Sequence, residues 1–139
     1  MARPTIEDTV TELEEDLSFF DEEDDRYRWL MELGRELEPL AREEMVDANR
    51  VTGCQSRVWL VSFVENGRLR FRAASDAAFV QGVLAMLLRI FDNRLPEEIL
   101  EANPGFLGRL GLSLSRRNGA HAVFNRMAAA ARAVQAAAG

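Results

Sequence analysis

Apolar residues recur at helical spacing in the first part of the chain. Between residues 5 and 19 they stand among acidic residues at positions 6, 10, 13 and 17, which predicts an amphipathic helix. The acidic run DEEDD at 21–25 breaks this pattern and is typical of the N-cap and first turn of a second helix. We expect that helix to end near Pro39 and to pack closely on a neighbour at Gly34. Its predicted buried residues are Tyr27, Leu30, Met31 and Leu37.

The pattern changes to a period of two after a polar connection at 40–50. Residues 57–64 are rich in β-branched and aromatic side chains and predict a strand. Asn66 and Gly67 favour a two-residue hairpin turn, and apolar residues then alternate with arginine through RLRFRA. With Glu65 opposite Arg68, one face should pack on helices and the other should stay at least half solvated. The expected pairs are Val64–Leu69 and Ser62–Phe71 on the packed face, and Phe63–Arg70 and Val61–Arg72 on the other.

Helical spacing returns after the hairpin. Ser75 or Asp76 is expected to cap a third helix, Pro96 opens a short helix that NPG at 103–105 ends, and an alanine-rich helix closes the chain. The expected buried residues are Phe79, Val80, Val83, Leu84, Leu87 and Phe91 in the third helix, and Val123, Met127 and Val134 in the last. The order of helices, hairpin and helices predicts one α+β domain over residues 1–139, with a small antiparallel β-sheet flanked by helices.

Composition removes several classes of function. The 139 residues are 47% hydrophobic and 29% charged, as in a globular protein. All 17 basic residues are arginine, so the chain lacks the lysine of a pyridoxal phosphate enzyme or of a P-loop. One cysteine and one histidine, Cys54 and His121, are too few for a structural zinc site or an iron–sulfur cluster. A metal site made of carboxylates alone is not excluded, although the sequence shows no spacing typical of a calcium-binding loop. We assign no metal ligand and expect no resident cofactor.

Charge is divided unevenly along the chain. Residues 1–48 carry 17 acidic and 5 basic side chains, whereas residues 49–139 carry 6 acidic and 12 basic ones. The acidic N-terminal helices are therefore expected to fold onto a basic remainder. The formal net charge of −6 argues against nucleic acid as a partner. No apolar run is long enough for a membrane span, and neither a signal-peptide pattern nor a cysteine pair is present, so a cytoplasmic protein without a membrane partner is expected.

The single thiol lies in the stretch NRVTGCQSRVWLVSF, residues 49–63. A lone cysteine is most often a small buried apolar residue. Here, however, TGCQS contains no other apolar side chain, and Gly53 frees the backbone, so a loop could present Cys54 at the mouth of the strand. Both interpretations stay open on these residues alone.

A reactive thiol needs donors, positive charge or a helix N-terminus to lower its pKa from about 8.5. Arg116 and Arg117, with Ser115 and Asn118, lie near the start of the last helix and are candidates, either for an anion or partner site or as ordinary surface residues. Asp76 is a first-turn carboxylate or a contact near the thiol, and His121 is expected to be structural or solvated.

Four blocks of sequence resemble one family. They are DDRYRWLMELGREL at 24–37, NRVTGCQSRVWL at 49–60, SDAAFVQG at 75–82 and LSLSRRNG at 112–119. In this order they are similar to the SufE family, the persulfide-accepting partners of cysteine desulfurases. The resemblance runs from about residue 20 to the C-terminus and leaves the acidic helix of residues 1–19 outside it. The chain departs from the family pattern at Leu114, where proline is frequent, and at Arg117, where a small residue is commoner.

The resemblance implies a function and a set of site residues. Cys54 matches the sulfur-accepting cysteine, within a loop that includes Gly53, Gln55 and Ser56. Asp76 and Arg116 match residues that the family places near the thiol. The implied fold is a SufE/IscU-like α+β domain.

The resemblance also implies two partners. The first is a SufS-like, pyridoxal-phosphate-dependent cysteine desulfurase, which this chain would both relieve of sulfur and activate. The second is a downstream iron–sulfur scaffold that takes the sulfur for cluster assembly. The chain itself would be an accessory protein rather than an enzyme.

Two other functions remain possible on the sequence. A cysteine-nucleophile hydrolase or transferase would need a base, for which His121 is the single histidine. An interaction module would carry Cys54 as an inert structural residue.

Overall fold

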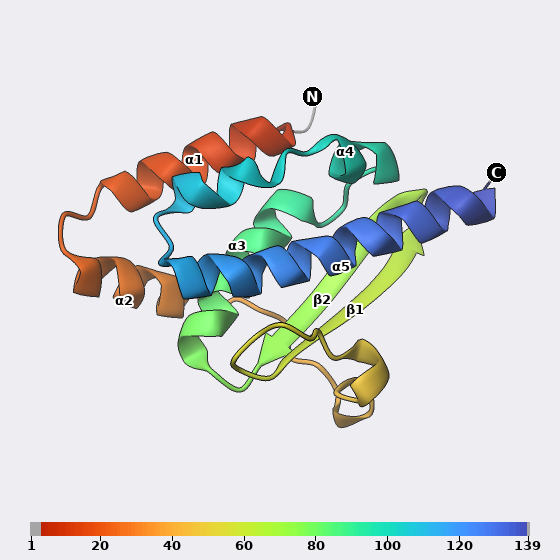
Figure 1. Ribbon diagram of the computed structural model, residues 1–139, viewed down its shortest axis with the longest axis horizontal. Helices are drawn as coiled ribbons and strands as arrows, with labels where there is room; N and C mark the ends of the chain where they lie inside the picture. The colour runs from red at the N-terminus through yellow and green to blue at the C-terminus, as the bar shows by residue number, and fades with distance from the viewer. Residues whose placement is uncertain (1–3, 139) are drawn as a thin grey trace.

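The computed structural model describes residues 4–138. Two N-terminal helices lead through a loop with two short 3₁₀ turns into a β-hairpin, and further helices cover one face of that hairpin (Figure 1). The order along the chain is α1 (Ile6–Ser18), α2 (Glu23–Gly34), η1 (Arg42–Glu44), η2 (Asp47–Asn49), β1 (Val58–Glu65), β2 (Arg68–Ser75), α3 (Ala78–Phe91), α4 (Pro96–Glu101), η3 (Pro104–Leu110) and α5 (Leu114–Ala138). This arrangement is the predicted α+β fold, with a two-stranded antiparallel sheet.

Helix α1 begins as a capped amphipathic helix. Thr5 accepts a hydrogen bond from the backbone N–H of Asp8, whose carboxylate accepts one from the backbone N–H of Thr5 in return. Val10, Leu13 and Leu17 are buried, as their spacing predicts. They pack the helix against α3 and η3 (Figure 1).

The α2 stripe is rotated relative to the prediction. Met31 is 39% exposed, and Leu33 takes its place in the core. Leu30, Leu33 and Gly34 follow the i, i+3, i+4 spacing of one helical face, from which Met31 is turned by about 100°. The prediction that Gly34 permits close packing is confirmed, because a Cβ there would lie 2.7 Å from the backbone nitrogen of Gly82 in α3.

The hairpin has the predicted register. Glu65 pairs with Arg68, and the two turn residues adopt positive φ angles, 54° at Asn66 and 77° at Gly67, as a two-residue primed turn requires. Alternate residues of β2 are buried, whereas β1 becomes exposed toward the turn. Val64 points to the packed face but is 50% exposed, because the helices do not cover that end of β1.

The expected cap of α3 is wrong. Ala77 occupies the N-cap position, and no side chain caps the helix. Ser75 instead donates a hydrogen bond to the carbonyl of Arg57 and accepts one from the backbone N–H of Ala77. Asp76 binds Arg57. Both side chains are thus occupied by the start of β1, so neither reaches the free N–H groups of the helix.

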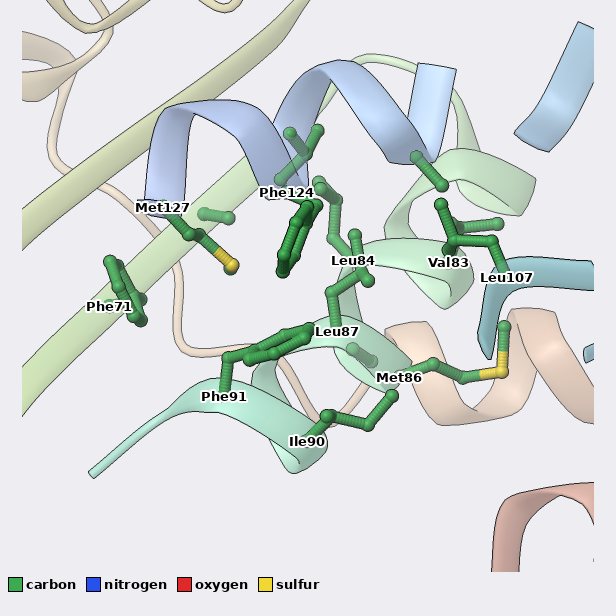
Figure 2. Packing of buried hydrophobic residues seen from close by; sticks show 14 of the residues in the cluster. Phe71, Val83, Leu84, Met86, Leu87, Ile90, Phe91, Leu107, Phe124 and Met127 are labelled. Atoms are coloured by element: carbon green, nitrogen blue, oxygen red, sulfur yellow. The ribbon is translucent and has the colours of Figure 1, made fainter. Parts of the chain in front are cut away.

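The core lies between α3, α5 and the covered face of the hairpin (Figure 2). Phe91, Phe106 and Phe124 form an aromatic cluster with ring centroids 5.1 to 5.8 Å apart. Phe106 belongs to η3, which begins where α4 was expected to end: Asn103 accepts a hydrogen bond from the backbone N–H of Gly105 at 2.9 Å and so caps this 3₁₀ segment. The NPG sequence therefore starts a new buried turn.

Arginines of the C-terminal part bind the acidic N-terminal helices, as the charge distribution predicts. Arg109 forms ion pairs with Glu7 and Glu14 of α1. Arg94, which is 2% exposed, donates to the carbonyl of Pro4 and to the hydroxyl of Thr9. Arg109 thus holds α1 against η3, and Arg94 holds it against the turn between α3 and α4. Among the helices of residues 4–138, none is both long and apolar enough to cross a bilayer.

Candidate functional site

Cys54 lies on a short loop that is closed at its base and rests on α5. The base is closed by a hydrogen bond from the backbone N–H of Val51 to the carbonyl of Val58, at 2.9 Å. The Cys54 thiol donates to the carbonyl of Gly119 in α5, with an Sγ–O distance of 3.5 Å. The side chain is half-buried. The thiol is therefore held by a helix residue that follows it by 65 positions in the sequence.

Gly53 allows the loop to take this path. Its φ angle is +93°, a region that residues with a Cβ rarely occupy. A Cβ at this position would also lie 3.3 Å from the Cβ of Ala122 in α5, closer than most such contacts. Gly53 thus supplies both the turn and the clearance that bring the next residue against the helix.

The thiol borders a small, mostly apolar cavity of about 50 Å³ between the loop, α3 and α5. That volume suits one or two atoms of the size of sulfur or water. The described lining residues are Cys54, Gln55, Val58, Val80, Val83, Leu84, Ser115, Arg116, Gly119, Ala120 and Val123. Gln55 and Arg116 supply its longer polar side chains, so the cavity can accept a small apolar group next to a polar rim.

Burial raises the pKa of the Cys54 thiol. Arg116 and Arg117 of α5 were candidates for lowering this pKa, and burial outweighs them. Arg116 lines the cavity, but its guanidinium carbon lies over the ring of Phe79, 4.2 Å from the centroid. Arg117 extends toward η3, with one guanidinium nitrogen 3.8 Å from where a Cβ of Gly108 would stand. In this arrangement desolvation dominates, and the thiol stays protonated at neutral pH.

Asp76 organises the strand side of the loop. It accepts hydrogen bonds from the backbone N–H of Arg57 at 3.1 Å and from its Nε at 3.0 Å. The side-chain hydrogen bond from Arg57 is the main cause that lowers the pKa of Asp76. Asp76 does not line the Cys54 cavity among the described residues, whereas Gln55 and Arg116 do. Of the predicted site residues, Cys54, Gln55 and Arg116 therefore meet at the cavity, whereas Asp76 holds the strand end of the loop.

The remaining predicted residues are peripheral. Ser56 is half-buried on the loop, and Leu114, 67% exposed, begins α5. His121 is exposed, with its ring against Phe124 at 6.3 Å between centroids. It is absent from the described residues that line the cavity. Its position gives no support to a histidine-activated nucleophile.

Sequence reasoning missed the face of α5 on which the loop rests. Gly119 and Ala122 contact the loop and are three residues apart, so they share one side of the helix. The small side chains at these positions were the available signal, because a loop can approach a helix closely only where side chains are small. Two valines of α3 that line the cavity, Val80 and Val83, were expected to be buried. Val83 is a core residue, and Val80 is half-buried against the core.

Comparisons with known proteins agree on one family. The family described as "SufE: Fe-S metabolism associated domain" matches residues 11–131. The chain is 32% identical to an uncharacterized SufE-like protein of Synechocystis, over 97% of this chain and 87% of that protein. It is 34% identical to the sulfur acceptor protein CsdE of Escherichia coli, over 80% of each.

A solved structure shares the fold. The solution structure of a hypothetical protein from Thermus thermophilus superposes with a TM-score of 0.72 at 23% identity, covering 98% of this chain and 99% of that one. At this identity the likeness shows the fold alone, and it confirms the α+β class.

Proposed function

This chain belongs to the SufE family, and from this premise we propose that it accepts persulfide sulfur on Cys54 from a SufS-like, pyridoxal-phosphate-dependent cysteine desulfurase. The name of the E. coli relative, a sulfur acceptor protein, supports the coarser role of sulfur acceptor. The observation that carries the proposal is the position of Cys54, on a glycine-containing loop beside a cavity large enough for one more sulfur atom.

The transfer is an exchange between sulfur atoms. The Cys54 thiolate attacks the outer sulfur of the persulfide on the desulfurase, and a new S–S bond forms at Cys54. The S–S bond of the donor breaks, and the donor cysteine leaves as a thiolate that takes up a proton. The proton lost from Cys54 passes to solvent or to the departing thiolate, so protons and electrons balance without an added oxidant or reductant.

The half-buried, protonated thiol leads us to propose that the loop moves for this reaction. A thiol whose pKa is raised by burial is a poor nucleophile at neutral pH, and the exchange requires the thiolate. We propose that docking of the desulfurase lifts the loop from α5 and exposes Cys54. Return of the loop would then shelter the persulfide in the cavity from reductants in bulk solvent.

The other predicted residues receive roles in this scheme. Gly53 would act as the hinge, and Gln55 and Ser56 would contact the desulfurase once the loop is lifted. Asp76 would keep the strand end of the loop fixed through Arg57. Arg116, at the rim of the cavity, would meet the incoming sulfur or the partner.

The fate of the sulfur completes the proposal. The chain has a single cysteine, so an internal thiol cannot resolve the persulfide. We propose that an iron–sulfur scaffold removes it, and that clearing the donor makes this chain an activator of its desulfurase. The chain would be an accessory protein that acts in the cytoplasm as a single SufE-like domain over residues 1–139.

The test is mass spectrometry of the intact protein after incubation with a cysteine desulfurase and free cysteine. We expect Cys54 to gain the mass of one sulfur atom, and the gain to disappear on treatment with a thiol reductant. The variant C54A should gain nothing and should fail to accelerate the desulfurase. If a desulfurase that loads other acceptors never loads Cys54, the proposed function is wrong.

A further inference from the structure

One stripe of α5 contacts both the Cys54 loop and the segment that leads into it. Gly119 accepts the thiol hydrogen bond, and Ala122 lies beside Gly53. One turn further on, Arg126 donates from Nη1 to the carbonyl of Arg50 at 2.9 Å and from Nη2 to the carbonyl of Ala48 at 2.6 Å. Positions 119, 122 and 126 are three and four residues apart, so they lie on one helical face.

The contact of Arg126 is well suited to hold a backbone segment. Its two guanidinium nitrogens reach two different carbonyls, which fixes both the position and the direction of the chain there. The carbonyls belong to the end of η2 and to the residue after it, a place where helical hydrogen bonding leaves acceptors free. Arg126 is half-buried, whereas Ala48 and Arg50 are exposed, so these two hydrogen bonds lie at the surface and act through their paired geometry.

We propose that Arg126 is a positioning residue that clamps the base of the Cys54 loop on α5 and so sets how often the thiol is presented. The two ends of the loop are held differently. Arg57, at the strand end, is bound by Ser75 at the end of β2 and by Asp76 in the turn before α3. The other end is bound by Arg126 from α5. Loss of the Arg126 hydrogen bonds loosens the segment before the loop, while the hydrogen bond from Val51 to Val58 still closes the loop base. We expect the loop to lift from Gly119 more often as a result.

This inference rests on the proposed function in one respect, namely that movement of the loop serves to expose Cys54 to a sulfur donor. The clamp itself is a property of the isolated chain. It can therefore be measured without a desulfurase, and its failure is distinguishable from failure of the sulfur-acceptor role.

The test compares R126M with R132M by the rate at which iodoacetamide alkylates Cys54. Methionine keeps an unbranched side chain and removes the donors; Arg132 is an exposed arginine of the same helix and serves as the matched control. We expect R126M to raise the alkylation rate at neutral pH about tenfold, because two hydrogen bonds from a charged group are lost. R132M should react like the wild type.

The pH profile of alkylation gives a second readout, the burial of Cys54. In the wild type the rate should rise with pH around a midpoint above the usual thiol pKa, because burial raises the pKa of Cys54. In R126M the midpoint should move down toward about 8.5, the value of an exposed thiol. Arg116 is the charged side chain among the described cavity residues, and it is unchanged in these variants.

A second variant protects the test against poor folding of R126M. R126K keeps the charge and one donor position but cannot bind both carbonyls with a planar fork, so its alkylation rate should lie between those of the wild type and R126M. An alkylation rate and pH midpoint that stay at wild-type values in both variants would overturn the clamp. Faster alkylation of R126M in a chain that never takes up sulfur would leave the clamp intact and remove the sulfur-acceptor role.

Discussion

Asp76 and Arg57 join the start of β1 to the turn before α3 through two hydrogen bonds, one from the backbone N–H and one from Nε of Arg57. Arg57 follows Cys54 closely along the chain. The strand end of the loop is therefore fixed by a carboxylate that had been expected to cap a helix or to contact the thiol. Its charge matters, because Arg57 holds the pKa of Asp76 below its usual range.

Because of this ion pair, we expect the stability of the folded protein to depend on pH in the acidic range. We expect D76N to lack that contribution. A carboxylate whose pKa is lowered by folding contributes stability above its unfolded pKa of about 3.9, and the contribution is lost as pH falls through the folded pKa. The melting temperature of the wild type should therefore fall more steeply than that of D76N on going from about pH 5 to about pH 2.5. Because the pair is exposed, the difference will be small.

Asparagine can still accept the backbone hydrogen bond, so D76N isolates the charge. A matched control is D25N, since Asp25 forms an exposed ion pair with Arg28 within α2, away from the loop. Parallel melting curves for the wild type and D76N across the acidic range would contradict the assigned role of Asp76.

The crossing of α2 and α3 predicts a severe effect of one added methyl group. A Cβ on Gly82 would lie 2.2 Å from the carbonyl oxygen of Leu30, a backbone atom that cannot move aside. We expect G82A to lower the free energy of unfolding by about 3 kcal/mol, as an overpacked core does. Urea denaturation measures it.

Gly108 provides the control for this substitution. A Cβ there would meet a side-chain nitrogen of Arg117 at 3.8 Å, an ordinary van der Waals distance. G108A should change the free energy of unfolding by less than about 0.5 kcal/mol. Equal effects of G82A and G108A would show that the helices separate more easily than their packing implies.

The sequence predicted most of the fold because its local signals agree with one another. Asn66 and Gly67 set the turn, and the alternation of apolar residues and arginine in β2 then allows only one register. The helical stripes were placed correctly where acidic residues surround them, as in α1. The rotation of α2 was missed because Met31 and Leu33 are both apolar, and periodicity alone does not choose between them.

The site was only partly predictable, since its geometry depends on contacts between distant segments. Cys54, Gln55 and Arg116 were identified from the sequence and do meet at one cavity. The contact of the thiol with Gly119 and the hydrogen bonds of Arg126 to the loop leave no local pattern. The raised pKa of Cys54 likewise follows from burial between segments that lie far apart in the sequence.

The hydrogen bonds of the buried Arg94 side chain are expected to hold α1 in place, and R94M tests this. In R94M the carbonyls of Pro4 and Ile90 and the hydroxyl of Thr9 each lose a donor. Ile90 is buried, Thr9 is half-buried and Pro4 is exposed, so the full cost of about 1 to 3 kcal/mol for a buried acceptor without a donor applies to Ile90 alone. With the smaller losses at the other two acceptors, we expect R94M to destabilise the protein by about 2 to 3 kcal/mol. Hydrogen exchange of α1 amides should accelerate more than that of α5 amides.

Arg89 is the matched control for Arg94. It pairs with Glu36 at 3.0 Å on the surface, where ion pairs contribute at most about 1 kcal/mol. R89M should leave the exchange rates of α1 unchanged. If R94M and R89M behave alike in both measurements, α1 is held by its apolar face alone.

The raised pKa of the Cys54 thiol predicts that its contribution to stability declines at alkaline pH. Below about pH 8.5, the pKa of an unfolded thiol, both folded and unfolded chains keep the proton, and the contribution is fully present. As pH rises from there through the folded pKa, the unfolded chain ionises first and gains stability relative to the folded one. The difference in free energy of unfolding between the wild type and C54A should therefore be constant from about pH 6 to about pH 8 and then shift against the wild type up to about pH 10. Urea denaturation under reducing conditions measures this difference.

A shift in the opposite direction would mean that the folded chain stabilises the thiolate. Arg116, at the rim of the same cavity, would then influence the thiol more strongly than burial does.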